Sequence, residues 1–551
     1  MDFIMTIVEQ GLIYGILTLG IYITYKILDF PDLTVDGSFP LGAAVTAALI
    51  TRGVNPYLTI PIAFLVGVLA GICTGLIHVK CKVRDLLSGI IMMTALYTVN
   101  LKIAGTNNVP LFSQETMFKN GMLESLFGET IPGYMKIVLI LLVVLIAKFL
   151  LDFYLQTKSG YLLRAVGDND NLVTALAKDK GNVKILGLAI SNGLVALSGC
   201  VFAQEQKVFD ISTGTGSMVI GLASVIIGTS LFKKLTFVKT TTAVIIGSIL
   251  YKGCVAIAIR FFDPQSMKLI TAVLFLVILV ISMERKQKAK GTAAGQKGGK
   301  MLELQHIHKY YNPGTVNEMC LFEDFNLSIK KGQFVSVVGS NGSGKTSMLN
   351  IVCGSINPDS GKILIEGQDI TKEKEYRRLR RIGRVYQNPA MGTCPNMTMA
   401  DHKGKFFGLS MGTNKSRIPF YQEQLRQLNL GLEDKLHVKV GSLSGGQRQA
   451  MSLLMSTMTP IDFLILDEHT AALDPKTAEL IMELTDKVVR EKQLTTIMVT
   501  HNLRYAVEYG DRLLMMHQGH AVMDLEGDEK KNMNVDTILE KFNEISIECG
   551  N

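Results

Sequence analysis

The sequence lacks the residue patterns that mark disulfide-rich or zinc-binding proteins. Its eight cysteines are scattered over 551 residues, with no C-x-x-C pair and no cluster of histidine and cysteine at metal-ligand spacing. This distribution favours free thiols and supports neither a disulfide framework nor a zinc site. The N-terminus also lacks basic residues ahead of its first apolar run, and no A-x-A-like site follows that run. We therefore expect no cleaved signal peptide.

Charged residues are few, at 19% of the chain, whereas hydrophobic residues reach 48%, which is high for a fully soluble protein. The formal net charge of +8 does not indicate a nucleic-acid partner, and we expect none. Lysine and arginine gather where apolar runs end, which is a signal of membrane topology. A chain of this length exceeds what one hydrophobic core serves, so we expect at least two domains.

Long apolar runs recur as far as residue 284. About 20 apolar residues cross the ~30 Å hydrocarbon layer of a membrane as a helix. The clearest runs are 57–79, 134–155 and 267–283, with others at 3–28, 38–51, 85–105, 184–206, 216–232 and 240–261. A single run could equally be a buried helix of a soluble protein, but their repetition excludes this. We predict an all-α membrane domain over residues 1–284 with about eight or nine spans. The short run 38–51 fits a re-entrant or broken helix as well as a full span.

Basic residues between the runs predict the orientation of this domain. They concentrate in 80–84, 158–184 and 233–239 and after residue 284. The positive-inside rule places these segments in the cytosol and the loops 106–133 and 207–215 outside.

Two polar joints interrupt the apolar runs. The stretch 28–44 carries Asp29, Asp32 and Asp36. Charged groups at membrane depth often mark a pathway, but the proline and glycine residues here favour an interfacial turn with solvated carboxylates and helix caps. The stretch 159–187 is polar and of mixed charge. We expect a short cytosolic helix there that offers a docking surface, with an ordinary loop as the alternative.

Residues 285–300 separate the two halves of the chain. They contain six Lys or Arg and four Gly, with no apolar periodicity. We predict a flexible basic linker that spans roughly 20–25 Å, and its lysines suit an anionic membrane surface. Met301 follows it and resembles the start of an independent domain, which we place at 301–551.

The second half begins with a strand pattern, a glycine loop and a helix pattern. The apolar run 334–338 leads into GSNGSGKTS (339–347). Gly339, Gly342 and Gly344 let the backbone curl so that its N–H groups point at phosphate oxygens. Lys345 is expected to reach the β- and γ-phosphates of ATP, and Thr346 to hold Mg²⁺. The remaining residues predicted to bind nucleotide in this loop are Ser340, Asn341, Ser343 and Ser347.

A second apolar strand pattern, FLILDEH (463–469), ends in two carboxylates. Phosphoryl transfer requires a metal ion, positioning and charge neutralisation rather than covalent chemistry from the protein. We predict that Asp467 holds Mg²⁺, directly or through water. Glu468 is expected to orient and polarise the attacking water.

Further motifs carry a resemblance to the ATP-binding-cassette (ABC) ATPases. LSGGQRQ (443–449) resembles their signature motif, AALDP (471–475) their D-loop, Gln387 their Q-loop and His501 their switch histidine. Tyr311 is similar to the aromatic residue that stacks on adenine, with Tyr310 as an adjacent candidate. The resemblance implies an α/β P-loop NTPase domain of ABC type in which Gln387 contacts Mg²⁺ and acts in catalysis with Glu468 and His501. The chain departs from the pattern at His469, where many members have proline, and at Ala471, where serine is common. Neither departure removes a group that hydrolysis needs, so we expect an active ATPase.

The same resemblance implies how ATP is bound. In this family two ATPase domains form a head-to-tail sandwich, with each nucleotide held between one P-loop and the other domain's signature. Ser444, Gly445, Gly446 and Gln447 would therefore contact the nucleotide of a partner. Because this chain has one P-loop and one signature, the resemblance implies a homodimer with two ATP and Mg²⁺ sites.

The first half resembles permeases of importers for branched-chain amino acids and sugars, and most closely those of tryptophan/tyrosine uptake systems. LDFPDLTVDGSFPLGAA (28–44), LLRAVGDN (162–169) and LGLAISNGLVALSG (186–199) carry the likeness. It implies a separate extracytoplasmic substrate-binding protein, and a coupling helix within 159–184 that docks on the ATPase near Gln387. We assign no substrate site, because small polar residues in spans more often join helices. Those residues are Thr94, Asn100, Ser191, Asn192 and Gln204.

Three functions are therefore open. The leading one is ATP-driven import of a small solute across the cytoplasmic membrane of a prokaryote, with the ATPase in the cytosol. The favoured solute is an amino acid of aromatic or branched-chain type. An exporter is the first alternative, because a permease fused ahead of an ATPase is a common exporter order. Against it, such exporters have six spans that extend far into the cytosol. The second alternative is a membrane-bound ATPase that transports nothing, but such proteins usually have few spans and a large outer domain.

Overall fold

The chain divides into two compact units. The computed structural model describes residues 2–120, 125, 133–168, 170–232, 239–261, 300–312, 318–393, 397–413, 415–438 and 440–548. One unit comprises Met1–Asp168 and Lys180–Lys286, and the other Asn169–Asp179 and Gln287–Asn551. The predicted linker lies outside the described residues except for its last residue, Lys300.

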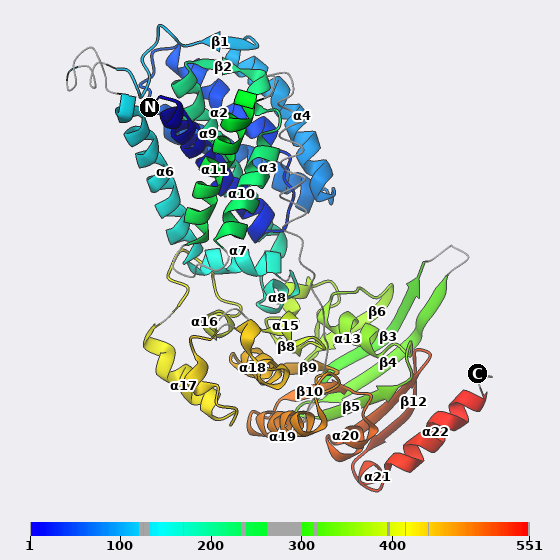
Figure 1. Ribbon diagram of the computed structural model, residues 1–551. Helices are drawn as coiled ribbons and strands as arrows, with labels where there is room; N and C mark the ends of the chain where they lie inside the picture. Colours follow the sequence, from blue (N-terminus) through cyan, green and yellow to red (C-terminus); the bar gives the residue numbers. More distant parts are fainter. Residues whose placement is uncertain are drawn as a thin grey trace. The chain divides into compact units, whose positions relative to one another are not determined.

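The first unit is helical, with one short antiparallel pair of strands that lie far apart in the sequence. Its elements are α1 (Asp2–Ile21), η1 (Tyr22–Ile27), α2 (Val35–Ile50), α3 (Thr59–Val79), α4 (Asp85–Ala104), β1 (Asn108–Pro110), α6 (Gly133–Leu155), α7 (Lys158–Asp168), α9 (Lys180–Gln206), β2 (Val208–Asp210), η2 (Ile211–Gly214), α10 (Ser217–Leu231) and α11 (Thr240–Phe261). β1 and β2 pair antiparallel at one end of the helices (Figure 1).

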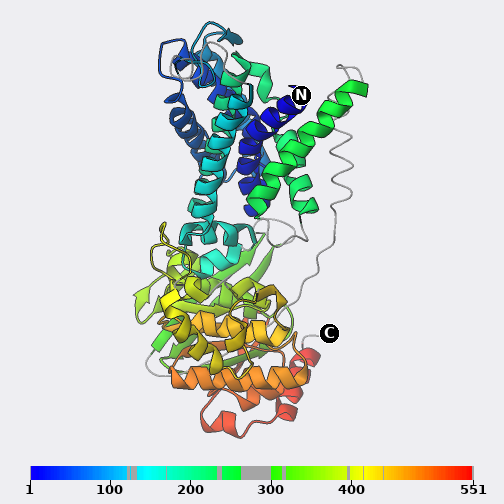
Figure 2. The same cartoon turned by 60° about the vertical axis from the view of Figure 1, so that its left-hand side comes forward.

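Seven helical segments among the described residues are long and apolar enough to cross a membrane. Each of them overlaps one of the predicted runs, and the shorter α2 matches the run 38–51. The predicted run 267–283 lies outside the described residues. The helices lie alongside one another in a bundle (Figure 2), which agrees with the predicted all-α membrane domain.

Glycine and serine residues bring the central helices into close contact. A Cβ on Gly71 of α3 would lie 2.2 Å from the carbonyl oxygen of Leu188 on α9. On α11, Ser248 Oγ donates a hydrogen bond of 2.6 Å to the carbonyl oxygen of Gly11 on α1. Small residues permit such backbone approach, and hydrogen bonds add to the dispersion contacts that join helices in lipid.

The joint at 28–44 differs from the turn with solvated carboxylates that the sequence favoured. Asp32 is only 1% exposed. Its Oδ1 accepts a hydrogen bond from Thr34 N at 2.9 Å, and its Oδ2 accepts one from Asn192 Nδ2 at 2.7 Å. The capping prediction holds for Asp36, whose carboxylate accepts from the backbone N–H groups of Gly216 and Met218 at the start of α10. The expectation of solvated carboxylates is therefore wrong for Asp32. The sequence did not reveal this, because its partner Asn192 on α9 is far away along the chain.

The second unit is an α/β domain with two sheets. Its elements are α8 (Asp170–Ala175), β3 (Lys300–Tyr311), β4 (Met319–Lys330), β5 (Phe334–Gly339), α13 (Lys345–Cys353), β6 (Ser360–Ile365), β7 (Gln368–Asp369), α14 (Glu375–Arg378), β8 (Ile382–Val385), α15 (Pro389–Gly392), α16 (Met397–Asp401), η4 (Lys415–Arg417), α17 (Ile418–Arg426), η5 (Glu433–Lys435), η6 (Val440–Ser442), α18 (Gly445–Thr457), β9 (Phe463–Asp467), α19 (Pro475–Glu491), β10 (Thr495–Val499), α20 (Leu503–Glu508), β11 (Arg512–His517), β12 (His520–Glu526), α21 (Asp528–Lys531) and α22 (Val535–Glu548).

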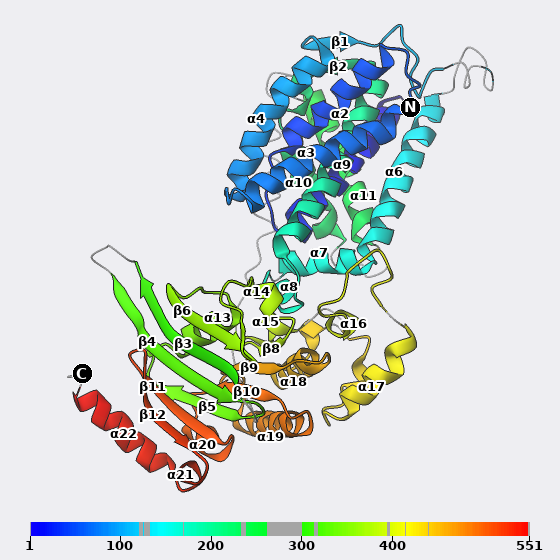
Figure 3. The same ribbon diagram turned by 180° about the vertical axis from the view of Figure 1, so that it is seen from behind.

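The larger sheet has the strand order β12-β11-β5-β10-β9-β8. Its strands are parallel except for β12. The smaller sheet is antiparallel, in the order β4-β3-β6-β7. α13 packs between the sheets, since its apolar residues share one core with both, while α19 covers the opposite face of the larger sheet (Figure 3). Parallel strands buried on both faces explain the continuous apolar runs that the sequence shows there.

Candidate functional site

The glycine loop lies between β5 and α13, as predicted. All six residues of β5 are buried, and α13 begins at Lys345. Gly344 has a left-handed φ of 98°, and a Cβ there would lie 2.9 Å from the ring of Phe322. Only glycine adopts this conformation without strain. The loop therefore presents its backbone at the N-terminus of α13, where N–H groups favour phosphate.

Lys345 lies folded against its own loop. Its Nζ donates hydrogen bonds to the carbonyl oxygens of Gly339 and Ser340 at 2.7 and 2.6 Å. Burial lowers the pKa of Lys345, and the nearby charge of Glu468 opposes this shift. The ammonium is thus held at the loop where the sequence predicted phosphate contact.

One cavity of about 310 Å³ collects most of the predicted nucleotide-binding residues. Tyr311 lines it, and Tyr310 is not among its lining residues, which favours Tyr311 as the adenine contact. Ser340 lies beside this group, with its Oγ 3.5 Å from His517 Nδ1. The lining residues are Tyr311, Met319, Leu321, Asn341, Gly342, Ser343, Gly344, Lys345, Thr346, Ser347, Glu468 and His501. Met319 and Leu321 were not predicted, because single apolar residues of a strand carry no motif.

The three predicted catalytic side chains meet at Glu468. Its Oε2 accepts a hydrogen bond of 2.8 Å from Gln387 Nε2, and its Oε1 is 2.7 Å from His501 Nε2. The loops after β8, β9 and β10 bring them together, because neighbouring parallel strands end at the same edge. Glu468 itself has a left-handed φ of 54°, a conformation that costs a non-glycine residue about 1–3 kcal/mol. Such strain is common where a side chain must be aimed at a reaction.

Asp467 lies on the last position of β9 and is 8% exposed. Burial raises its pKa, and the guanidinium of Arg384, with Nη2 3.3 Å from Asp467 Oδ2, opposes this shift. Arg384 also donates to Asn350 Oδ1 on α13 at 2.8 Å. The sequence interpretation missed Arg384. The signal was a single basic residue inside the buried strand Ile382–Val385, just ahead of Gln387.

Some predicted site residues do not line this cavity. Gly339, Ser340, Gln387 and Asp467 adjoin its lining residues in sequence or by contact, whereas the signature residues do not. Ser444 caps α18, accepting from Gln447 N at 3.2 Å and donating its own N–H to Gln447 Oε1 at 3.3 Å. Gly446 packs against Thr477, where a Cβ would lie 2.3 Å from Thr477 Cγ2. Ser444, Gly445, Gly446 and Gln447 are absent from the lining of the nucleotide cavity. Within one chain, P-loop and signature are therefore separate.

Comparison with known proteins identifies the chain. A family model described as "Branched-chain amino acid transport system / permease component" matches residues 3–283, and one described as "ABC transporter" matches residues 322–471. The chain belongs to the ABC transporter family. It joins a permease domain and an ATP-hydrolysing domain of that family in one polypeptide.

Two relatives from Clostridioides difficile (strain R20291) each match one part of this ABC transporter. The chain is 45% identical over 280 residues to a tyrosine transport system permease protein, covering 51% of this chain and 91% of that protein. It is 44% identical over 253 residues to a tyrosine transport ATP-binding protein, covering 44% of this chain and 98% of that protein. Among solved structures, a dimeric ATP-binding cassette with ADP and phosphate is 28% identical, with a TM-score of 0.36, covering 41% of this chain and 98% of that one.

The residues of this ABC transporter fit ATP with Mg²⁺. Among the described residues, no group of three His, Cys, Asp or Glu could hold a metal ion by itself. Mg²⁺ in nucleotide sites typically takes one or two protein oxygens together with phosphates and water. Asp467 and Glu468 are adjacent carboxylates. Burial raises the pKa of Asp467, and the charge of Glu468 adds to this shift. A cation bound by the predicted donors Thr346, Gln387 and Asp467 would offset the repulsion between these two carboxylates.

His469, which departs from the family pattern described above, is buried directly after Glu468. It is 1% exposed, and its Nε2 lies 2.7 Å from Thr485 Oγ1 on α19. Thr485 donates its hydroxyl proton to the carbonyl oxygen of Ile481 at 2.7 Å, so it accepts from His469 Nε2–H. His469 Nδ1 has no hydrogen-bond partner among the described residues. Burial lowers the pKa of His469 well below 6.5, which fits a neutral ring that ties the Glu468 turn to α19.

The predicted polar joint at 159–187 forms two helices that belong to different units. α7 lies in the first unit, whereas residues 169–179, with α8, belong to the ATPase unit. α8 packs against α14 and against α15, which begins at Pro389, next to the Gln387 loop. After α8, the carbonyl oxygen of Leu176 accepts from Gly404 N at 3.2 Å. The Nζ of Lys178 lies 5.5 Å from the centroid of the Phe407 ring. The joint is therefore a structured element and not an ordinary loop.

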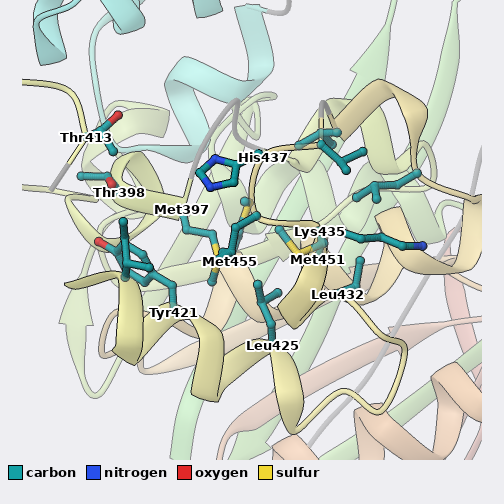
Figure 4. Close-up of a pocket in the computed structure, with 15 residues that line it drawn as sticks. Met397, Thr398, Thr413, Tyr421, Leu425, Leu432, Lys435, His437, Met451 and Met455 are labelled. Carbon is teal, nitrogen blue, oxygen red and sulfur yellow. The ribbon is translucent and has the colours of Figure 1, made fainter. Parts of the chain in front are cut away.

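A second cavity of the ATPase unit, of about 180 Å³, lies beside the signature helix (Figure 4). α16, α17 and α18 surround it, with Met397, Tyr421, Met451 and Met455 among its lining residues. Leu443, which precedes the Ser444 cap, also lines it. Flexible methionine side chains fill irregular space, so the packing around the signature helix is looser than that of the sheet core.

Proposed function

We propose that this chain takes up an aromatic amino acid, of which tyrosine is the leading candidate, across the cytoplasmic membrane of a prokaryote. The observation that carries the proposal is the 45% identity to a tyrosine transport system permease protein over 91% of that protein. The relative of the second half is also described as part of tyrosine transport. Both halves thus point to the same substrate class.

The proposed direction is import. The family description of residues 3–283 concerns an amino-acid transport permease. Seven long apolar helices together with the shorter α2 exceed the six spans of the exporter type that we considered. The exporter alternative rests only on the order of the two domains in the chain.

We infer that two copies of the chain assemble head to tail. One nucleotide cavity contains the P-loop, Glu468 and His501 but none of the signature residues. A second copy would supply Ser444 and Gly446 across the interface, and the reciprocal site would form at the same time. The proposed unit is a homodimer in contact with membrane lipid, with a separate substrate-binding protein on the extracytoplasmic side.

In this proposal each residue of the site has a separate task. Lys345 and the loop amides bind the phosphates, and Thr346, Gln387 and Asp467 would hold Mg²⁺, which supplies charge neutralisation when bound. Glu468 accepts a hydrogen bond from the attacking water and orients it. Gln387 and His501 hold the Glu468 carboxylate in place through the contacts at 2.8 and 2.7 Å. α8, beside the Gln387 loop, would transmit the state of the site to the permease.

Uptake by proteoliposomes tests this function. The full chain is reconstituted with ATP inside, and radiolabelled L-tyrosine is added outside together with the proposed extracytoplasmic substrate-binding protein. We expect accumulation that requires both ATP and the binding protein. Efflux towards the side of the binding protein, or accumulation without ATP, would overturn the importer proposal. Leucine, methionine and phosphate serve as competing solutes that define the substrate class.

A further inference from the structure

Lys252 is a basic residue inside the candidate span Thr240–Ala258. It lies twelve residues after Thr240, which is about 18 Å along the axis at ~1.5 Å per residue. Basic side chains at such depth are costly, and those that occur usually pair with an anion or face a polar pathway. Among the residues that the structure describes, no carboxylate lies within ion-pair distance of Lys252 Nζ.

The ammonium of Lys252 lies over an aromatic ring instead. Its Nζ is 3.5 Å from the centroid of the Tyr14 ring. Tyr14 stacks on Phe39 with their centroids 5.7 Å apart, and Phe202 lies 6.0 Å from Tyr14 and 5.4 Å from Phe39. We call Tyr14, Phe39 and Phe202 the ring cluster. Its members come from α1, α2 and α9, which lie together in the middle of the bundle (Figures 1 and 3).

The neighbouring residue Tyr251 gives a second, independent observation. Its side chain is 1% exposed, and its Oη has no hydrogen-bond partner within the described part of the chain. Buried hydroxyl groups nearly always have a partner. By contrast, Lys252 and Phe202 are only half-buried. This part of the bundle therefore contains three notable groups. They are the ammonium of Lys252 and the hydroxyl of Tyr251, which have no carboxylate and no hydrogen-bond partner respectively among the described residues, and the half-buried ring of Phe202.

These groups match the parts of an aromatic amino acid. A cation–π contact offsets the desolvation of an ammonium only in part, whereas a carboxylate forms a charge-assisted hydrogen bond with it. Edge-to-face or offset contact with an exposed ring favours an aromatic side chain over an aliphatic one. A purely structural cation–π contact explains Tyr14 and Lys252 but leaves Tyr251 Oη without a role.

Resting on the proposed function, we propose that Lys252 binds the carboxylate of the transported amino acid, with Phe202 of the ring cluster against the substrate's aromatic side chain. Tyr251, the adjacent residue along α11, has a hydroxyl group without a partner among the described residues and is proposed as a second donor. The subsite is then part of the path through the permease and not of the substrate-binding protein.

Equilibrium dialysis of radiolabelled ligands against the purified full chain tests the carboxylate contact directly. We expect wild-type chain to bind L-tyrosine at least tenfold more tightly than tyramine, which lacks the carboxylate. Lys252→Met should remove this preference, Lys252→Arg should keep it within about threefold, and the exposed Lys102→Met on α4 should leave it unchanged. Equal binding of tyramine and L-tyrosine by the wild type overturns the proposal without reference to any variant. So does a Lys252→Met chain that keeps the preference.

The uptake experiment separates failure of this inference from failure of the proposed function. If wild-type proteoliposomes take up no amino acid, the proposed function fails. If they accumulate L-tyrosine and Lys252→Met accumulates it equally fast, only the subsite is wrong. Phe202→Leu tests the ring contact, and we expect it to lower the ratio of tyrosine to leucine uptake at least threefold. An unchanged ratio removes Phe202 from the subsite.

Discussion

The two units of this ABC transporter handle buried polar groups in different ways. In the ATPase unit, Glu468, Gln387 and His501 meet at the ends of adjacent strands and line or adjoin an open cavity. In the membrane unit, Asp32 and Asn192 are enclosed and bond to each other across a long sequence separation. The first arrangement leaves groups available for a ligand, whereas the second uses them to join helices.

The difference predicts that a change in the ATPase unit affects chemistry, whereas a change in the membrane polar network affects assembly. α8 is a separate case. It lies in sequence between α7 and α9 of the membrane unit, but by its contacts it belongs to the ATPase unit. The predictions below test this division, from the largest expected effect to the smallest.

Glu468→Gln should have the largest effect. The amide keeps the shape of the side chain but cannot accept a proton or polarise water as a carboxylate does, so phosphate release should fall by about 100-fold or more. ATP binding and ATP-dependent dimerisation should persist, as measured by nucleotide filtration and gel filtration. The matched control is Glu366→Gln, which changes a surface carboxylate paired with Lys331. Unchanged turnover in Glu468→Gln would remove this residue from the catalytic role.

Leu176→Asp should separate hydrolysis from transport. Leu176 is 2% exposed and its carbonyl oxygen accepts from Gly404 N in the ATPase unit. A buried charge there costs several kcal/mol and should displace the segment after α8. We expect uptake in proteoliposomes to fall at least tenfold while basal ATPase activity stays within about threefold. Insertion of Gly/Ser residues within 289–300 is the control and should leave uptake largely intact. The reverse pattern would show that the mechanical connection lies in that linker.

Asp32→Ala should destabilise the membrane unit and leave the nucleotide site intact. The change leaves Thr34 N and one hydrogen of the Asn192 amide without their acceptor, which costs about 2–3 kcal/mol in a buried network. Cys200 is 0% exposed. In a chain whose other seven cysteines are replaced by serine, its reaction with a thiol dye on heating reports the opening of this unit. The exposed Asp29→Asn is the matched control in the same segment. If both variants open at the wild-type temperature, the Asp32 network does not stabilise the unit.

The contrast between the ATPase unit and the membrane unit also shows which features could be predicted from the sequence. Gly344, Lys345, Asp467 and Glu468 were predictable because strand, loop and helix patterns lie next to one another along the chain. Eight helical segments were predictable because apolar runs recur along the first half of the chain. The partners of Asp32 and the pairing of Arg384 with Asp467 were not, because they depend on packing between segments far apart in sequence. The signature motif was recognised, but its residues do not line the nucleotide cavity of the same chain.

Arg384→Met tests one of these unpredicted contacts. Without the guanidinium, the pKa of Asp467 should rise further, because burial is no longer opposed. More Asp467 is then protonated near neutral pH, so ATPase activity should fall about tenfold, or ~1.4 kcal/mol, and recover as the pH is raised. A higher Mg²⁺ concentration should also be needed for half-maximal activity. Arg381→Met, which removes a surface pair with Asp462, is the control. An unaltered pH profile would show that Arg384 does not tune Asp467.

The smallest effect concerns His469 and the pH dependence of stability. Because burial lowers the pKa of His469 in the folded chain, the unfolded chain binds more protons below pH ~6.5. Stability from the neutral ring is therefore fully present above pH ~6.5 and is lost as the pH falls through the folded pKa, at about 1.4 kcal/mol for each pH unit in that window. In a chain whose other seven cysteines are replaced by serine, the reaction of the buried Cys353 with a thiol dye on heating measures this in the ATPase unit. His469→Gln should flatten the acid side of the profile, whereas the exposed His520→Gln should not. Parallel profiles for His469→Gln and wild type would mean that the acid sensitivity of this unit comes from its carboxylates. His469 would then hold the Glu468 turn in place but have no role in the pH response.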